Sequence, residues 1–317
     1  MKLFVTGGMG FIGSNFIRYI LDKYPKYEIV NIDSLTYAAN PDTLKDLEDN
    51  PRYKHIAADI TEELVMNAYM EDCDAVVHFA AESHVDNSIK GSKDFIKTNI
   101  TGTHVLLECA RKLGIRFHHV STDEVYGHLG KTGKFKETTP YNPRSPYSAS
   151  KASSDHLVRA YYHTYGLPIT ITNCSNNYGA YQHIEKLIPK FITNLIKGDE
   201  VTVYGKGQNI RDWIHVLDHC RAIDLVLHKG KIGETYLVGG DCELNNMEIT
   251  MEILNEMGMG EEMIHFVEDR AGHDFRYAID HSKITNELGW KPEYDFKGGL
   301  KSTIDWYKEN RHWWDLE

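Results

Sequence analysis

Apolar and polar positions follow two different periods over the first 172 residues of the chain. Short, nearly continuous apolar runs predict strands of a parallel sheet, and longer runs with apolar residues three and four apart predict helices between them. Such alternation predicts right-handed strand–helix–strand units with helices on the sheet. The predicted strands are 2–6, 28–32, 53–58, 75–80, 115–120 and 167–173, and the predicted helices include 14–23, 94–112 and 145–165.

The pattern changes after about residue 173, where segments become shorter and loops longer. We therefore expect two domains, 1–172 and a smaller lobe over 173–317 that closes over the sheet. The boundary is soft, because later strands or helices can return to the first domain. Residues 127–140, rich in Gly, Lys and Thr, are predicted to form a loop at the rim of a site.

A glycine-rich turn connects the first predicted strand to the first predicted helix. Residues 8–13 fit G-x-G-x-x-G, and Gly7 extends the pattern. In this context glycines allow a tight turn, and N–H groups at the helix start bind a pyrophosphate. Asp33, about 20 residues further on, ends the second strand, where a carboxylate binds ribose hydroxyls and repels a 2′-phosphate. The motif predicts a Rossmann-type doubly wound domain that binds NAD rather than NADP, the alternative being a purely structural turn.

Tyr147 and Lys151 lie near the start of the predicted helix 145–165. Ser145 suits the N-cap and Pro146 the first helical position. A spacing of four places the two side chains on one face, where the ammonium favours the phenolate. Tyr147 is therefore predicted to act as a base near neutral pH. The spacing also occurs by chance, and only the dinucleotide motif before it favours a carbonyl or alcohol catalyst over a structural pair.

Two adjacent carboxylates, Asp123 and Glu124, follow the predicted strand 115–120. One can donate a proton while the other removes one, which eliminates water and which a simple dehydrogenase does not need. Successive side chains of a strand point to opposite faces, so both reach one substrate only if the strand has ended. Like charges held close raise one pKa, which keeps one group protonated as the acid. Taken alone, the pair is more often a solvated turn.

Composition and charge limit the possible partners. A net charge of −11 argues against nucleic acid, because the phosphate backbone requires a basic surface. A local pair such as Lys186 and Arg211 can still bind an anionic small molecule. His215 and His219 have the spacing of a helical metal pair, but no third ligand is evident, and we expect no metal.

We expect a cytoplasmic protein. No apolar run approaches the ~20 residues that span a membrane, and the first residues do not resemble an export signal. An odd number of scattered cysteines suggests reduced thiols. These cysteines are residues 73, 109, 174, 220 and 242.

The motifs together resemble the extended short-chain dehydrogenases that act on nucleotide sugars, and the Asp123-Glu124 pair resembles the dehydratases among them. Asp59-Ile60 and Ser121-Thr122 fit the same pattern. The resemblance extends over nearly the whole chain, through residues 80–86, 121–127, 173–179, 185–189, 209–213 and 273–278.

The resemblance implies three sets of site residues. The catalytic set is Thr122, Asp123, Glu124, Tyr147 and Lys151. The NAD set is Gly7, Gly10, Phe11, Ile12, Gly13, Asp33, Asp59, Ile60, Ala81, Thr98, Tyr147, Lys151 and Asn177. The nucleotide-sugar set is Ser83, Thr122, Asn176, Lys186, Leu187, Tyr204, Arg211, Asn246, Arg270 and His273, although the second-lobe residues, taken singly, could serve packing alone.

The resemblance also implies a reaction on a nucleotide diphosphate-glucose, in the first place dTDP-glucose. Tyr147, helped by Lys151, takes the C4 hydroxyl proton while hydride moves to NAD, and Thr122 hydrogen-bonds the developing ketone. Glu124 then removes the C5 proton and Asp123 protonates the departing C6 hydroxyl. Hydride returns to C6 and gives a 4-keto-6-deoxy sugar, as used for deoxysugars such as rhamnose.

Three alternatives stay open: a UDP-glucose 4,6-dehydratase, a nucleotide-sugar 4-epimerase and a non-catalytic NAD-binding sensor. The Asp-Glu pair disfavours the epimerase, and the complete catalytic set disfavours the sensor. Asn87, Thr202 and residues 180–184 depart from the family's pattern and leave the sugar and the base open.

The predicted helices 94–112 and 145–165 suggest a homodimer. They carry more apolar residues than one sheet contact requires, and a second apolar stripe must be buried somewhere. The resemblance implies that these helices pair with their symmetry mates, whereas the alternative is that the chain itself covers them. The apolar residues concerned are Leu106, Leu107, Ala110, Leu157, Val158, Tyr161 and Tyr162.

Overall fold

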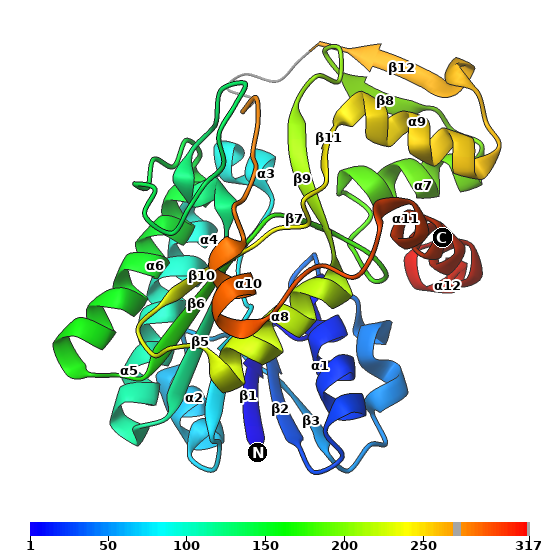
Figure 1. The fold of residues 1–317 in the computed structure, drawn as a ribbon. Coiled ribbons are helices and arrows are strands. Elements are labelled where there is room, and N and C mark those ends of the chain that lie inside the picture. The colour runs from blue at the N-terminus through cyan, green and yellow to red at the C-terminus, as the bar shows by residue number, and fades with distance from the viewer. Residues whose placement is uncertain (269–273, 316–317) are drawn as a thin grey trace.

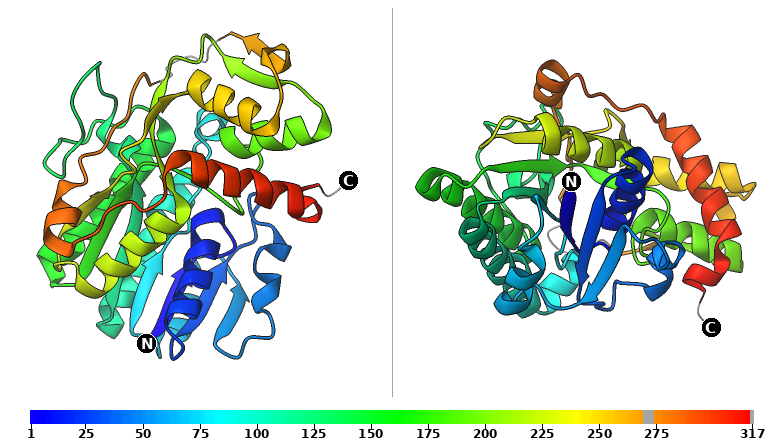
Figure 2. Two further views of the ribbon diagram at one scale, coloured as in Figure 1. Left: turned by 45° about the vertical axis from the view of Figure 1, so that its right-hand side comes forward. Right: turned by 90° about the horizontal axis from the view of Figure 1, so that it is seen from below.

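The computed structural model describes residues 1–268 and 274–315. A large parallel sheet with helices on both faces carries a smaller lobe above the carboxyl ends of its strands (Figures 1 and 2). This is the α/β, doubly wound fold that the sequence predicts.

The large sheet contains seven strands in the part of the chain that the structure describes, in the order β3-β2-β1-β4-β5-β6-β10, and all neighbours are parallel. The direction of winding reverses between β1 and β4, and the crevice at such a point is where these sheets bind ligands. The strands are β1 (Lys2–Thr6), β2 (Glu28–Asp33), β3 (Tyr53–Ala57), β4 (Ala75–His78), β5 (Arg116–Thr122), β6 (Ile169–Cys174) and β10 (Thr235–Val238).

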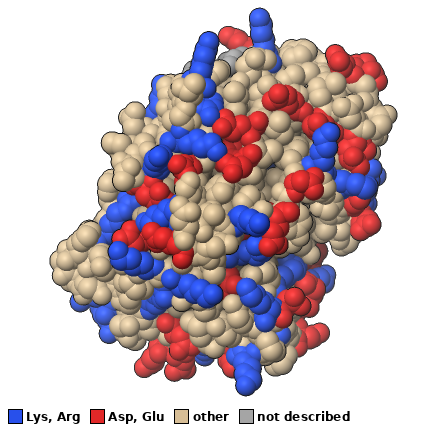
Figure 3. Space-filling model, in the orientation of Figure 1, with Lys and Arg blue, Asp and Glu red and all other residues tan. Residues whose placement is uncertain are grey.

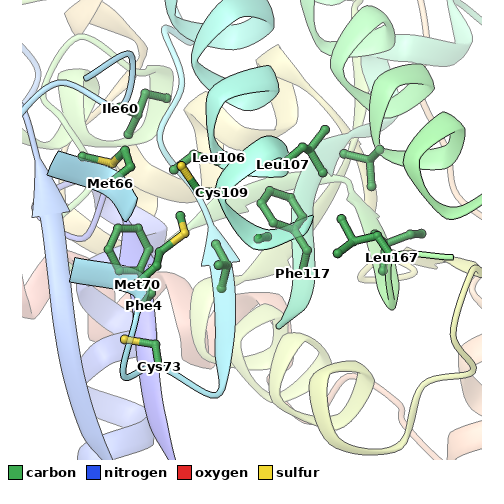
Figure 4. Close-up of a cluster of buried hydrophobic side chains, with 14 of the residues drawn as sticks. Phe4, Ile60, Met66, Met70, Cys73, Leu106, Leu107, Cys109, Phe117 and Leu167 are labelled. Atoms are coloured by element: carbon green, nitrogen blue, oxygen red, sulfur yellow. The ribbon is translucent and has the colours of Figure 1, made fainter. Parts of the chain in front are cut away.

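Amphipathic helices bury their apolar stripes on the two faces of this sheet. α1 (Phe11–Lys23) and α8 (Val216–Lys229) share one core with β1, built around Phe16, Ile20 and Ile223. The opposite face carries α2 (Glu63–Met70), α5 (Thr103–Leu113) and α6 (Pro146–Tyr165), whose core is drawn in Figure 4. Two short helices, η1 (Pro41–Leu47) and α3 (Val85–Lys90), lie in the connections.

The smaller lobe has a core of its own, in which α7, α9 and α11 pack around small sheets. The expected boundary at 172/173 stays a prediction, and β10 and α8 return to the large sheet. The elements are β7 (Asn176–Tyr178), α7 (Leu187–Lys197), β8 (Val201–Tyr204), β9 (Ile210–His215), β11 (Glu243–Asn245), α9 (Asn246–Met257), η4 (Glu261–Met263), β12 (Ile264–Val267), α10 (Ser282–Leu288), α11 (Phe296–Glu309) and α12 (Arg311–Trp314).

The predicted helix 94–112 is not a regular α-helix. α4 (Lys93–Phe95) leads into a π-helical turn, η2 (Ile96–Gly102), before α5 begins. Asn99 in this turn exchanges hydrogen bonds with the backbone of Glu82. Gly102 packs so closely on Ile60 that a Cβ would lie 2.4 Å from its Cδ1. π-Helical turns are frequent at functional sites, and periodicity alone does not reveal them.

The apolar residues behind the dimer expectation are largely buried within one chain. Leu106, Leu107, Ala110 and Val158 are fully buried and Tyr161 nearly so. Leu106 and Leu107 point into the core beneath the sheet (Figure 4). The prediction that these positions need a partner to cover them was therefore wrong, because α2 and the sheet already do so. Leu157 and Tyr162 are only partly buried.

The surface of the protein is charged, and its cysteines are unpaired. Acidic and basic side chains are interspersed over the face in Figure 3. Within residues 1–268 and 274–315, no helix is long and apolar enough to cross a membrane. The five cysteines are free thiols.

Candidate active site

A cavity runs along the carboxyl ends of β1 to β6, and all of the expected NAD residues line it. Gly7 has a φ of +72°, and a Cβ there would lie 2.6 Å from the backbone nitrogen of Ala80. A Cβ on Gly13 would lie 2.4 Å from the carbonyl oxygen of Gly7. Both positions therefore require glycine. The N-terminus of α1, at Phe11, opens onto the cavity and can bind an anion.

Two carboxylates lie along the same cavity, at the ends of β2 and β3. Asp33 accepts backbone hydrogen bonds from Met9 and Leu35, both at 2.9 Å, and burial raises its pKa. Burial also opposes the ionisation of Asp59, but the ion pair with Lys97 at 2.7 Å and two hydrogen bonds from Thr61 together outweigh it and lower the pKa. The glycine turn thus holds Asp33 at the end of β2, on the wall of the cavity, and its role at the ribose stays a prediction.

A second cavity of about 900 Å³ separates the large sheet from the smaller lobe. Arg211, on β9, is nearly buried, stacks on the ring of Tyr277 and donates to the carbonyl oxygen of Asp274. Arg270 and His273 lie outside the described residues. The expected substrate residues that line this cavity are Ser83, Asn176, Lys186, Leu187, Tyr204, Arg211 and Asn246.

The two cavities meet at Glu124, which lines both, as do Ser83, Asn176 and Lys186. β5 ends at Thr122, and a 3-10 turn, η3 (Asp123–Tyr126), follows directly. The Thr122 hydroxyl caps this turn by accepting from the backbone N–H of Glu124. The strand has thus ended before the carboxylate pair, as the sequence argument requires, and strand alternation no longer forces the two side chains apart.

Asp123 and Glu124 lie in different environments. Asp123 is 1% exposed, and its Oδ2 has no hydrogen-bond partner among the described residues. Burial, and then the charges of Glu124 and Asp212, raise the pKa of Asp123 well above its usual range. Burial also raises the pKa of Glu124, but Arg211, Lys186 and a hydrogen bond from Ser148 oppose the rise. Asp123 is therefore the better proton donor and Glu124 the better base.

Tyr147 and Lys151 lie in the first two turns of α6, and both are buried. Ser145 caps the helix through the N–H of Ser148, as predicted. The Lys151 ammonium donates to the carbonyl of Val120 at 2.9 Å. Burial, and next the charge of Glu124, raise the pKa of Tyr147 well above its usual value. Burial and the carboxylates oppose the phenolate form, and the prediction that Lys151 makes Tyr147 a base near neutral pH stays a prediction.

His215 and His219 have other partners than a metal. The ring of His219 hydrogen-bonds to Asn177 at 2.9 Å, and His215 stacks on Tyr294. No group of three possible metal ligands occurs in the described ranges.

Sequence reasoning missed Arg144, Asp274 and Tyr277 as residues that line the second cavity. Arg144 directly precedes the N-cap of α6 and donates to Asp274 at 3.1 Å. The sequence signal that could have identified Arg144 is its position directly before the helix that carries Tyr147 and Lys151. Among the departures from the family's pattern, Asn87, Thr202, His183 and Ile184 all line this same cavity.

Comparison with known proteins identifies the family. The family model for GDP-mannose 4,6 dehydratase matches residues 4–303. The chain is 50% identical to the dTDP-glucose 4,6-dehydratase of Mycolicibacterium smegmatis over 317 residues, which is 99% of this chain and 95% of that protein. The chain belongs to the dTDP-glucose 4,6-dehydratase family. The resemblance inferred from the motifs is thereby confirmed.

Solved structures agree with this assignment. The dTDP-glucose 4,6-dehydratase of Streptomyces venezuelae, solved with NAD and TYD bound, has a TM-score of 0.97 and 49% identity, with 100% of this chain and 99% of that chain covered. A UDP-glucose 4-epimerase from Thermotoga maritima also matches, at a TM-score of 0.91 and 27% identity, with 100% of both chains covered. The backbone alone therefore does not separate a dehydratase from an epimerase.

Proposed function

We propose that this chain is an NAD-dependent dehydratase that converts dTDP-glucose to its 4-keto-6-deoxy derivative. The observation that carries the proposal is the Asp123-Glu124 turn at the junction of the two cavities. The Asp123 carboxyl is buried, and its Oδ2 has no hydrogen-bond partner among the described residues, whereas Glu124 faces Arg211, Lys186 and Ser148. Water elimination needs this pairing of a proton donor with a base.

NAD fits the first cavity. The glycine turn and the start of α1 would hold the pyrophosphate, and Asp33 the adenosine ribose. The chemistry that NAD supplies when bound is hydride acceptance from C4 and hydride return to C6. The remaining NAD contacts are those expected from the family, including Asp59, Ile60, Thr98 and Asn177.

The protein groups move the protons. Tyr147 takes the proton of the C4 hydroxyl, with Lys151 beside it on α6, and Thr122 donates a hydrogen bond to the developing C4 ketone. The ketone acidifies the C5 proton, which Glu124 removes. Asp123 donates its proton to the C6 hydroxyl, which leaves as water, and the two carboxyl groups exchange their charge states in that step. When hydride returns to C6, Glu124 gives a proton back to C5.

The second cavity would hold the nucleotide. Arg211 offers a fork-shaped guanidinium and Lys186 a compact charge, which together suit a diphosphate. Tyr204, Asn246 and Leu187, with Arg270 and His273 by family resemblance, would surround the nucleoside. dTDP is proposed over UDP on the identity of the relatives, and the departures at Asn87 and Thr202 make that choice worth testing.

Oligomeric state, location and pathway belong to the proposal as well. A homodimer through η2, α5 and α6 is supported by two exposed apolar side chains, Ile96 of η2, which is 52% exposed, and Tyr165 of α6, which is 56% exposed. Free thiols suit a reducing cytoplasm. A 4-keto-6-deoxy product would feed deoxysugar formation, of which rhamnose is one example.

The test is a panel of dTDP-glucose, UDP-glucose and GDP-mannose, with the 4-keto product read by its absorbance in alkali. We expect rapid conversion of dTDP-glucose and slow or no conversion of the others. The Glu124→Gln variant is the matched control for enzyme-dependent signal. Preferred conversion of UDP-glucose would overturn the nucleotide assignment, and absence of any 4-keto product would overturn the dehydratase.

A further inference from the structure

The buried face of α6 continues past the catalytic pair. Asp155 follows Lys151 by one helical turn, so the two side chains share a face of the helix. Asp155 is 0% exposed, although an ionised carboxylate is costly to bury without partners. It takes no part in the proton transfers proposed above.

Two donors and a histidine ring surround the Asp155 carboxylate. Tyr141 donates to Oδ2 at 2.6 Å, and the amide of Asn173 donates to the same oxygen at 3.0 Å. The ring of His119 lies 3.2 Å from Oδ1. Asn173 also donates to the carbonyl oxygen of Thr122 at 3.0 Å. The carboxylate thereby connects α6 to β5 and β6 directly beneath the catalytic turn.

Asp155 is the counter-charge of the buried Lys151 ammonium, because the histidines and the thiol near that ammonium are neutral. Burial, and the charge of Lys151, lower the pKa of His119 to about 4, so that ring is neutral. Burial likewise keeps His78 neutral and raises the pKa of the Cys174 thiol to about 12. Burial lowers the pKa of Lys151 itself, and the charge of Asp155 acts against this loss.

The surroundings of Asp155 favour its ionised form. Burial opposes ionisation, but His119, Arg159 and Lys151 outweigh it and hold the pKa of Asp155 well below its usual value. Arg159, one further turn along α6, donates to the Tyr141 hydroxyl at 2.7 Å. Tyr126 and Tyr141, the other titratable groups facing Asp155, keep their protons, because burial raises both pKa values.

We propose that Asp155 is a positioning residue for Lys151, and that its carboxylate keeps this buried amine in the ammonium form that assists Tyr147. The role rests on the proposed function, since it assigns Lys151 to that chemistry. Without Asp155 the neutral amine is favoured, so Lys151 loses its proton at a lower pH. The alkaline limb of the activity profile then moves to lower pH.

The test compares three variants by kcat and KM across pH with dTDP-glucose. Asp155→Asn removes the charge and is expected to move the alkaline limb down by about one unit or more, with little change in KM. Asp155→Glu keeps the charge, and its alkaline limb is expected to lie close to that of the unmodified protein. Tyr141→Phe removes one hydrogen bond and no charge, so its limb stays in place. If Asp155→Asn lowers activity by the same factor at every pH, so that neither limb of the profile moves, the proposal is overturned.

A second measurement titrates the unmodified protein and so does not depend on how the Asp155 variants fold. The Lys151 side chain of the unmodified protein is titrated by NMR of labelled lysine, and its signal is assigned by its loss in Lys151→Met. We expect the amine to stay charged through neutral pH, whereas uncompensated buried lysines lose their proton at about pH 5–6. Titration in that lower range overturns the proposal. An unmodified protein inactive on every nucleotide sugar would contradict the proposed function instead, and the titration would still be decided.

Discussion

The Ser148 hydroxyl donates a hydrogen bond to the Glu124 carboxylate at 3.2 Å. Ser148 follows Tyr147 in the first turn of α6, and Glu124 lies in the turn after β5. The contact therefore connects α6, which carries Tyr147 and Lys151, to the turn η3, which carries Asp123 and Glu124. It also lets one hydroxyl influence the charge of the base that is proposed to remove the C5 proton.

Removing this hydroxyl tests the assignment of Glu124 as the base. The Ser148 hydrogen bond lowers the pKa of Glu124, so Ser148→Ala raises it. Glu124 must be ionised to act, and the acid limb of kcat/KM therefore moves to higher pH, by about half a unit to one unit. Ser153→Ala is the control, because the Ser153 hydroxyl donates to the Ala149 carbonyl oxygen, one turn back on α6, and not to Glu124. An unmoved acid limb in Ser148→Ala would argue against Glu124.

The dehydration step is separable from the oxidation step. Glu124→Gln and Asp123→Asn are expected to bind NAD but lose turnover by about 10²–10⁴, the usual contribution of an acid–base group. Exchange of the C5 hydrogen with solvent should fall most in Glu124→Gln. Exchange at the unmodified rate in that variant is the result that would refute its role.

Cofactor choice is predicted to depend on Asp33. Asp33→Asn removes the charge that repels a 2′-phosphate but keeps an oxygen that can accept from Met9 or Leu35. We expect the preference for NAD over NADP to narrow without loss of the fold, whereas Asp33→Ala also loosens the glycine turn. Binding of both cofactors is measured by titration, and equal affinities in the unmodified protein would contradict the assignment.

The proposed dimer needs probes on the surface rather than in the core. Leu106→Asp buries a charge and should cost several kcal/mol of stability in any oligomeric state. Ala160, exposed on α6, is the better site. Ala160→Arg is expected to give a folded monomer by light scattering, with unchanged circular dichroism. A monomer for the unmodified protein at micromolar concentration would refute the dimer.

The sequence predicts the first domain well because local pattern and tertiary structure agree there. Strands β1 to β6 form within two residues of their predicted ends, and Ser145 caps α6 as expected. The glycine turn, Asp33 and the carboxylate pair also lie where their motifs place them, since these depend on chain geometry close in sequence.

Long-range packing accounts for what the sequence did not predict. The apolar stripes of α5 are covered by α2, and no helical period reports which neighbour covers a stripe. The pKa of Tyr147 depends on burial and on Glu124, which lies on another segment. Asp155 reads as one more polar helix position, and only the approach of His119, Tyr141 and Asn173 gives it a role.

The most direct test of the central claim follows the hydrogen at C4. dTDP-glucose carrying deuterium at C4 is converted by the unmodified protein, and the product is examined by NMR and mass spectrometry. The account predicts a 4-keto-6-deoxy product in which the deuterium has moved to C6. Deuterium retained at C4 of an epimerised sugar, or no 4-keto product at all, would contradict it.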